Sequence, residues 1–564
     1  MKSLSKIIIA VLLLLPFSCD TLNFKDKLSN PNAATEESAS ADLLFNSMQL
    51  SFANMYNSAN RFIAQPMRME AMTWGVDYNA AFGSTTGNTV WSIAYAQIFP
   101  DYDAFLAIAE PAELNAHIGA AKVIKAYTLM LLVDLFGDVP YTEAGGGVSN
   151  PSPVADDQSA LYDTVKTLLD EAISDLDPAN VSRGFPGTDL FYGSGDNRAK
   201  WAAAANSLLM KWALNKNDMG VFDAAAANAI SSNDGDFDFH YGTNRNNPNA
   251  RHPQYNSQYE TSDGVYMSNF YMWNMRGSNG GAEVGTDKDS KDPRIRYYFY
   301  RQTDTALGED QFTIDCPFRP RPTHYAARDP FCLATNIPAG VDPTGNADGA
   351  EGYWGRDHGD ADGIPPDGQL RTVYGVYPAG GLFDGDTFKN TKKSGTLGGL
   401  GQGIWPVMDN YNVHFMMAER ALKGGDVAGG RTHMEAGIRA SITKVMDFAD
   451  AVDEADVDPA FVPSSGDIDT YVNEVLANYD AATDPMDVVM KEFHIALWGN
   501  AMDAWDAYKR TGYPSGLQPT REPSDAIPFP HMFLYPSIYV DLNQNASQRS
   551  FGEMTFWDPG KSLK

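Results

Sequence analysis

Apolar side chains recur at helical spacing in the N-terminal and C-terminal parts of the chain. Leu44, Met48, Phe52 and Met55 repeat at intervals of four, four and three residues, which predicts one face of a helix. Three further stripes have the same spacing: Leu161, Val165, Leu168, Ala172 and Leu176; Trp201, Ala205, Leu208 and Trp212; and Tyr411, Phe415, Ala418 and Leu422. Each stripe predicts a helix whose apolar face is buried on another helix.

Two longer helices are predicted from the residues that end them. The run from Asn115 to Leu135 is followed by Gly137 and Pro140, which stop a helix. The stripe Val489, Phe493, Leu497, Ala501, Trp505 and Tyr508 predicts a second long helix, ended by Gly512 and Pro514. Asp196 or Asn197 is available to cap the helix that contains Trp201.

The middle of the chain has a different pattern. Residues 232–406 are rich in Gly, Asp, Asn, Pro and aromatic side chains, and helical periodicity is hard to find there. Residues 297–300 and 372–377 are candidate strands. The whole pattern predicts a mainly α fold, compatible with stacked helical hairpins, that carries a large loop-rich insertion. Loops held by rigid helices are where binding groups usually lie.

The N-terminus predicts a lipoprotein signal. Lys2 and Lys6 precede the short apolar run 7–15, and Cys19 follows it closely. We interpret residues 1–18 as a removed signal peptide, residues 19–40 as a lipidated tether, and residues 41–564 as the folded body. The alternative is an ordinary signal peptide with an incidental cysteine.

Charge limits the possible partners. The 564 residues carry a formal net charge of -30, with a pI of about 4.5. Such an acidic surface repels the phosphates of nucleic acid and of anionic lipid headgroups. We therefore expect contact with the membrane through the lipid anchor only, and no nucleic-acid partner.

Two cysteines remain after Cys19. Cys316 and Cys332 are an even pair in an exported chain, which predicts one disulfide. Two unpaired thiols are the alternative, and a metal site is less favoured because the usual CxxC spacing is missing.

Several segments resemble those of SusD/RagB-like nutrient-binding lipoproteins. Residues 134–144 read DLFGDVPYTEA, and residues 189–193, with Lys200 and Trp201, are similar to the next helix of that family. Residues 411–419 resemble its Y-x-V-x-F-x-x-A-E helix, and residues 505–514 and 535–536 resemble its C-terminal motif. His531 departs from the pattern, since the family commonly has Arg ahead of the Tyr-Pro pair.

The resemblance implies a scaffold of helical hairpins similar to tetratricopeptide repeats, anchored in the outer membrane and facing the exterior. It also implies a SusC-like TonB-dependent transporter as partner, which receives oligosaccharides or peptides from the lipoprotein. The 134–144 motif also has a structural interpretation as a corner, because Gly137 and Pro140 turn the chain and Asp134 and Asp138 can bond local amides.

Catalytic motifs are not found in the sequence. There is no HExxH zinc helix and no GxSxG elbow, and the Gly-rich run 395–403 lacks the Lys-Ser/Thr of a phosphate loop. We assign no catalytic residue and no required cofactor, and we predict a binding protein rather than an enzyme. A lipid-anchored surface hydrolase and a structural or adhesive surface lipoprotein are the alternatives.

One segment has oxygen ligands at close spacing around glycines. Asp342, Asn346, Asp348 and Glu351 would suit a structural calcium ion, although their spacing departs from an EF-hand loop. A solvated Asp/Gly turn is the alternative.

Aromatic residues in loops are the candidates for ligand contact, because rings stack on the apolar faces of sugars while amides take the hydroxyls. The best candidate stretch contains Trp74, Tyr78, Asn79 and Phe82. Two further candidates are Trp273 and Trp354. For each ring the alternative is core packing, and His358 is predicted to hold a loop by hydrogen bonds.

Overall fold

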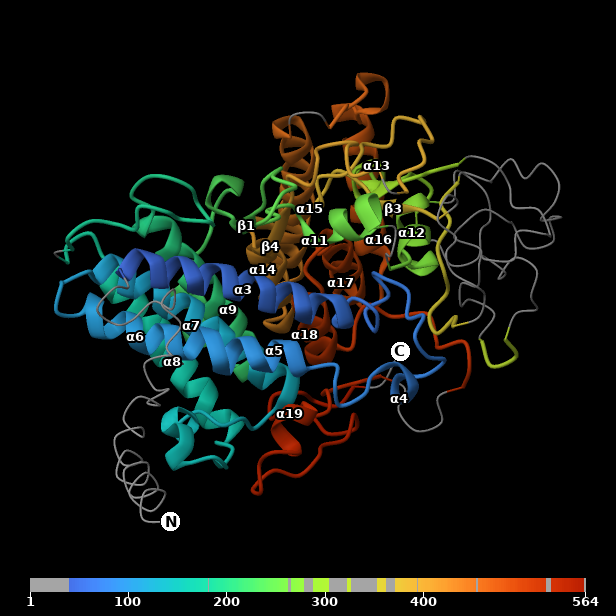
Figure 1. Ribbon diagram of the computed structural model, residues 1–564. Helices are drawn as coiled ribbons and strands as arrows, with labels where there is room; N and C mark the ends of the chain where they lie inside the picture. Colours follow the sequence, from blue (N-terminus) through green and yellow to red (C-terminus); the bar gives the residue numbers. More distant parts are fainter. Residues whose placement is uncertain are drawn as a thin grey trace, which may run out of the picture.

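The computed structural model describes residues 40–180, 182–261, 265–277, 288–303, 322–325, 352–361, 371–392, 394–452, 455–523 and 529–561. Helices dominate this part of the chain (Figure 1), so the prediction of a mainly α fold is confirmed. Within the described residues no helix is both long enough and apolar enough to cross a membrane.

Most of the N-terminal helices lie in the left half of the molecule in Figure 1, whereas α4 lies at the lower right. They are α3 (Ala41–Ile63), α4 (Tyr78–Ala81), α5 (Asn88–Ile93), the π-helix η3 (Ala94–Ile98), α6 (Phe99–Ala109), α7 (Asn115–Phe136), the 3-10 helix η4 (Ala144–Ser149), α8 (Gln158–Asp175), α9 (Arg198–Lys216), α10 (Met219–Ala226) and the 3-10 helix η5 (Asn233–Gly235). Helix α7 packs against α8, and α9 packs against α10, so consecutive helices form hairpins.

The middle of the chain contains short elements. They are β1 (Phe237–His240), α11 (Pro253–Tyr255), the π-helix η6 (Asn256–Thr261), α12 (Asn269–Arg276), α13 (Ile295–Tyr298), β2 (Phe299–Tyr300), β3 (Val373–Tyr374) and β4 (Ile404–Met408). β1 pairs with β4 in antiparallel register, with His240 opposite Ile404, and β2 pairs with β3, with Phe299 opposite Tyr374. The candidate strand at 297–300 is shortened to Phe299 and Tyr300, because α13 takes Tyr297 and Tyr298, and the candidate at 372–377 is shortened to Val373 and Tyr374.

The C-terminal helices α14 to α17 lie at the upper centre of Figure 1, α18 lies below them, and α19 lies at the bottom. They are α14 (Asn410–Lys423), α15 (Val427–Ala451), the 3-10 helix η9 (Pro459–Phe461), α16 (Ser465–Ala481), α17 (Pro485–Ala496), α18 (Ala501–Thr511) and α19 (Ser537–Val540). Helices α14 and α15 form another hairpin. The single long helix predicted for 489–508 is wrong, because the chain breaks at Gly499 (φ +96°) and Asn500 starts α18 by accepting from the backbone N–H of Asp503.

Helix boundaries follow the local signals elsewhere. Helix α3 starts after Ser40, whose hydroxyl accepts from the backbone N–H of Leu43. Helix α7 ends at Phe136, and Gly137 follows with φ +73°, as the sequence predicted. Asn197 precedes α9, but its amide donates to Asp189 instead of capping the helix.

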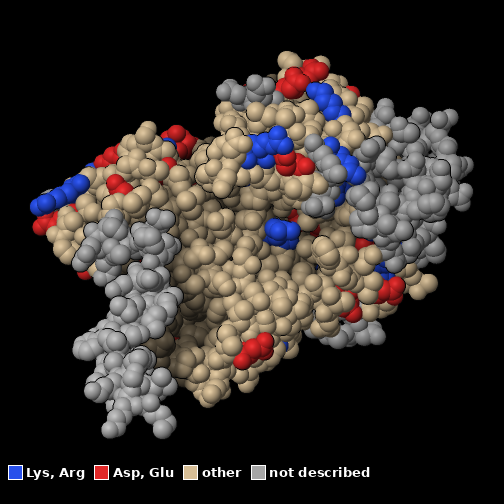
Figure 2. All heavy atoms as spheres, viewed as in Figure 1, with Lys and Arg blue, Asp and Glu red and all other residues tan. Residues whose placement is uncertain are grey.

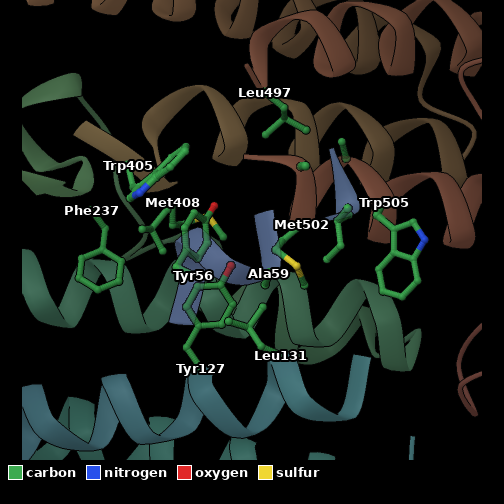
Figure 3. Close-up of a cluster of buried hydrophobic side chains, with 14 of the residues drawn as sticks. Tyr56, Ala59, Tyr127, Leu131, Phe237, Trp405, Met408, Leu497, Met502 and Trp505 are labelled. Atoms are coloured by element: carbon green, nitrogen blue, oxygen red, sulfur yellow. The ribbon is translucent and has the colours of Figure 1, made fainter. Parts of the chain in front are cut away.

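The core joins elements that are far apart in the sequence. Tyr56, Tyr127, Trp405, Met502 and Trp505 come from α3, α7, β4 and α18, and Figure 3 shows them in one buried cluster, with Trp405 and Trp505 at its two ends. The Tyr56 hydroxyl donates to the backbone carbonyl of Pro406 at 2.9 Å. The two ends of the chain therefore share one apolar core.

The 134–144 segment is tied down by distant partners. The Tyr162 hydroxyl and the Trp557 indole donate to Asp134, and Asp138 accepts from the backbone N–H of Gln158 and from the Arg549 guanidinium. These partners fit the interpretation as a structural corner, but they are not the local amides of the turn that the sequence suggested.

A buried lysine links β1 with α15. Lys444 Nζ lies 2.8 Å from Asp236, 2.5 Å from Asp238 and 3.2 Å from Asp409. Burial alone would lower the pKa of Lys444, but the three carboxylates outweigh it and raise the pKa well above its usual range. Among the described residues these three aspartates are spaced closely enough for a metal ion, and the lysine ammonium lies where an ion would bind.

We predict that Lys444→Met lowers the free energy of unfolding by about 3–5 kcal/mol, because it leaves buried carboxylates without their cation. The matched control is Lys166→Met, which removes a surface pair with Asp170 and should cost less than about 1 kcal/mol. Urea unfolding followed by circular dichroism measures both, and equal effects would contradict the prediction.

Candidate functional site

Four loop segments meet around Trp74. Gly359 N–H donates to the Met72 carbonyl at 3.0 Å, and Arg521 N–H donates to the His358 carbonyl at 2.9 Å. The Tyr325 hydroxyl donates to the Pro519 carbonyl at 2.9 Å. Residues 72–82, 322–325, 357–361 and 518–522 are therefore held together, although most of them lie outside helices and strands.

Gly359 permits a close approach between three of these segments. Its φ is +79°, and a Cβ atom built on it would lie 2.9 Å from the Val76 carbonyl oxygen and 3.1 Å from the Arg521 nitrogen. A larger residue would therefore separate the loops. Arg521 also forms an ion pair with Asp360 at 2.6 Å, which is a second link between residues 357–361 and 518–522.

Trp74 lies at the surface of this cluster. Its side chain is 80% exposed, which is unusual for the largest apolar residue. Asn79 is exposed nearby in sequence, on α4, where Asp77 caps the helix by accepting from Ala80 N–H at 2.8 Å. An exposed ring and an exposed amide on a fixed loop cluster can together contact a ligand with an apolar face and hydroxyl groups.

Tyr78 and Phe82 differ from Trp74 in exposure. Both are buried and stack on each other, with ring centroids 6.3 Å apart and planes 12° apart. Tyr78 is 3.0 Å from His358 Nε2, so this histidine does hold a loop by hydrogen bonds, as predicted. The interpretation of Tyr78 and Phe82 as ligand contacts is corrected to core packing, because neither ring has an exposed face.

Trp354 is also a packing residue. It is buried, and its backbone N–H donates to the Thr372 hydroxyl at 2.7 Å while its carbonyl accepts from Thr372 N–H. Its assignment as a ligand contact is corrected for the same reason.

Trp273 is as buried as Phe82, at 3% exposed, and lies at the edge of a separate recess of about 730 Å³ between α12, α16 and α17. Phe270 and Ile495 form part of its apolar wall, and residues 513–516 close one side. Ser515 donates to Asp487 at 2.5 Å, which fixes that side. The structure does not place Trp273 beside Trp74, but the chain from residue 513 to 522 runs from the recess to the Trp74 cluster.

Other predicted sites lie outside the described residues. These are the lipidated Cys19, the calcium ligands Asp342, Asn346, Asp348 and Glu351, and the disulfide pair Cys316 and Cys332. They stay predictions.

A buried glutamate lies at the start of the Trp74 segment and was not identified from the sequence. Glu70 Oε1 accepts from the Tyr374 hydroxyl at 2.7 Å and from the Gln254 amide at 3.2 Å. Burial raises the pKa of Glu70 to about 7, against the smaller lowering effects of Tyr374 and Arg61. No sequence pattern distinguishes this carboxyl from an exposed one, since its environment comes from segments far away in the chain.

The fold matches solved proteins. A chitin-binding protein is 18% identical, with a TM-score of 0.60 over 92% of this chain and 99% of that one. A SusD/RagB family protein from Bacteroides thetaiotaomicron is 16% identical, with a TM-score of 0.61 over 93% of this chain and 100% of that one. None of the curated proteins compared with the chain matches it.

The family model described as "Starch-binding associating with outer membrane" matches residues 31–312 and 380–536. This match covers well over half of the sequence, and the chain therefore belongs to the SusD-like family. The resemblance stated from the sequence motifs is confirmed.

We predict different stability effects for Tyr78 and Trp74. Tyr78→Ala should lower the free energy of unfolding by about 3–5 kcal/mol, because it removes a buried ring and leaves a cavity. Trp74→Ala should change it by less than about 0.5 kcal/mol, because the ring is exposed. Thermal and urea unfolding test this pair, and a large loss for Trp74→Ala would show that its ring is packed.

We also predict a pH effect from Glu70. In the folded state the Glu70 carboxyl keeps its proton up to about pH 7, whereas in the unfolded state it loses the proton near the ordinary pKa of 4.5. The stability that the proton contributes is therefore complete below about pH 4.5 and lost as the pH rises through 7.

The Glu70→Gln variant should remove this loss. Relative to the wild type, it should gain roughly 2–3 kcal/mol in unfolding free energy between pH 5 and pH 8.5. Glu110→Gln, at an exposed position, controls for the change in net charge. A constant difference between Glu70→Gln and wild type across this range would contradict the prediction.

Proposed function

We propose that this chain captures neutral glycans at the outer surface of the outer membrane and delivers them to a SusC-like TonB-dependent transporter. It acts as a lipoprotein anchored through Cys19, and it makes and breaks no bond in its ligand. The observation that carries the proposal is the exposed ring of Trp74 on a fixed loop cluster, in a member of a family described as starch-binding.

Two further points support a glycan over a peptide. A structural neighbour bears the name chitin-binding protein, and its chain is covered almost completely. The exposed groups nearest in sequence to Trp74 include the amide of Asn79, which can both donate to and accept from sugar hydroxyls. Peptide capture would instead use an exposed strand edge or deep side-chain pockets.

The mechanism follows from the geometry around Trp74. The pyranose ring would stack on the exposed indole, which removes apolar surface of both partners from water. Since residues 357–361 and 518–522 already fix the loop, little backbone freedom would be lost on binding. The affinity would stay moderate, which suits a protein that must release its ligand to a transporter.

Calorimetric titration of the purified protein with maltoheptaose and chitohexaose tests this function. We expect one of them to bind, Trp74→Ala to weaken binding roughly 5- to 20-fold, and Trp74→Phe to keep most of the affinity. Leu542→Ala, at another exposed apolar side chain, is the matched control and should bind as the wild type does.

The same samples distinguish the alternatives. Shorter oligosaccharides appearing in the mixture would indicate a surface hydrolase. An absence of binding to both glycans would contradict glycan capture and favour a peptide ligand or an adhesive role.

A further inference from the structure

Two histidines face each other across the hairpin of α14 and α15. His414 lies on α14 and His433 on α15, and their ring centroids are 6.1 Å apart with the ring planes inclined by 30°. Both residues are half-buried, so small solutes can reach them from the surface. The short turn at 424–426 makes the two helices antiparallel neighbours and brings the two imidazoles together.

Two glycines on α15 let the helices approach closely on either side of His433. A Cβ atom on Gly430 would lie 2.8 Å from the Leu422 side chain, and a Cβ atom on Gly437 would lie 2.9 Å from the Phe415 ring. Packing at both points fixes the distance between α14 and α15, because neither helix can shift without opening these contacts. The positions of the two histidines are therefore set by the scaffold.

Hydrogen bonding distinguishes this pair from the other histidines. The chain has nine histidines, and all of them lie in the part that the structure describes. Those with a ring nitrogen bonded to another group of the protein are His117, His240, His252, His324, His358, His494 and His531. His414 and His433 have no such partner among the described residues, and His414 Nδ1 is buried as well. The two histidines without a partner are therefore the two that face each other.

Both imidazoles are largely neutral at pH 7. Burial lowers the pKa of His414, and the neighbouring His433 lowers it further. Burial also lowers the pKa of His433, against a smaller raising effect of Asp426. Neutral imidazole is the form that binds a metal ion, so protons compete little for these nitrogens at neutral pH.

The spacing of the rings suits one metal ion between them. With metal–nitrogen bonds of about 2.0–2.1 Å and each nitrogen about 1.1 Å from its ring centre, two imidazoles on one ion have centres about 5.2–6.4 Å apart. The observed 6.1 Å lies within this range. A recess of about 630 Å³ between α9, α10 and α14 reaches His414 and offers an entry path and room for water ligands.

Hard cations fit this place less well. Calcium and magnesium take several oxygen ligands, whereas imidazole nitrogen suits zinc and copper. Carboxylates around α15 already have cationic partners, since Arg431 pairs with Asp480 at 2.8 Å and Arg439 with Asp469 at 2.9 Å. Figure 2 shows acidic and basic atoms next to each other over the part of the molecule where α13 and α15 lie. The three aspartates around Lys444 likewise have the lysine as their cation.

We propose that His414 and His433 together bind one divalent transition-metal ion, Zn²⁺ or Cu²⁺, with water in its other coordination positions. The ion links α14 to α15 and stabilises their hairpin. The site is separate from the Trp74 cluster, so the inference goes beyond glycan capture and does not depend on it.

Calorimetric titration of the full-length protein in detergent tests the site, with Zn²⁺ and Cu²⁺ in separate arms after a chelator has removed other metals. We expect one strong site per chain for at least one of these ions at pH 7.5. His414→Ala and His433→Ala should each weaken it roughly 30- to 300-fold, because a single imidazole cannot chelate the ion. His324→Ala removes one exposed imidazole elsewhere and is the matched control, which should bind as the wild type does.

A second pair of variants separates metal binding from folding. His414→Gln and His433→Gln keep a polar side chain of similar length, and they should lose the site while unfolding in chelator at the same temperature as the wild type. Zinc at about 100 times its dissociation constant should raise the unfolding midpoint of the wild type by about 2–4 °C and leave the double Gln variant unchanged. Lowering the pH to 5 should weaken binding at least about tenfold, because protons then compete for both rings.

Electron paramagnetic resonance of the Cu²⁺ complex counts the nitrogen ligands. The inference predicts two imidazole nitrogens in the wild type and one in His433→Ala. Strong binding that survives in the double Gln variant would assign the ion to other groups and overturn the inference. An absence of binding for both ions, or a Cu²⁺ spectrum without two nitrogens, would show that the two rings only pack against each other.

Discussion

Buried cations hold the two halves of this protein together. Lys211 on α9 pairs with Asp503 at 2.6 Å and Asp506 at 2.9 Å on α18. Arg510 on α18 donates to Glu419 on α14 through its Nε and one Nη atom, at 2.7 Å each, and to the Asn215 side chain on α9 through the other Nη atom, at 2.7 Å. A buried charge is tolerated only with its partner in place, so these pairs fix which helices must be neighbours.

Burial and the paired cations shift the pKa values of the buried carboxyl groups. Burial would raise the pKa of Glu419, but Arg510 and Lys423 outweigh it and lower the pKa to about 2. Burial also favours the neutral form of Asp236, and its pKa rises to about 7 despite Lys444. Glu419, which pairs with Arg510 of α18, is therefore firmly ionised, whereas Asp236 beside β1 is closer to neutral. The ion pairs beside β1 are for that reason more sensitive to pH.

Periodicity predicted the helices well because it reports local burial, and it failed where tertiary contacts decide. The stripe from Val489 to Tyr508 continues across the break at Gly499, since Leu497 and Trp498 stay in the core outside either helix. The buried pairing of Lys444 with Asp236, Asp238 and Asp409 has no local pattern, because the sequence does not show that residues 236 and 444 meet.

The candidate site was only partly predictable for the same reason. Trp74 and Tyr78 lie four residues apart in one loop-rich stretch, and the local sequence does not show which of the two rings is exposed. Burial of the rings in this stretch depends on segments far along the chain. His358 lies beside Tyr78, and Phe533 packs against Phe82. The motifs identified the family, since they mark helix ends and corners, whereas the exposure of a single ring depends on the assembled loops.

Rigidity of the loops connects the scaffold to the proposed function. Gly359 and the Arg521–Asp360 pair hold the loops that display Trp74. A ligand surface that is already rigid before docking can bind first and be covered afterwards, which is the order that capture followed by delivery requires.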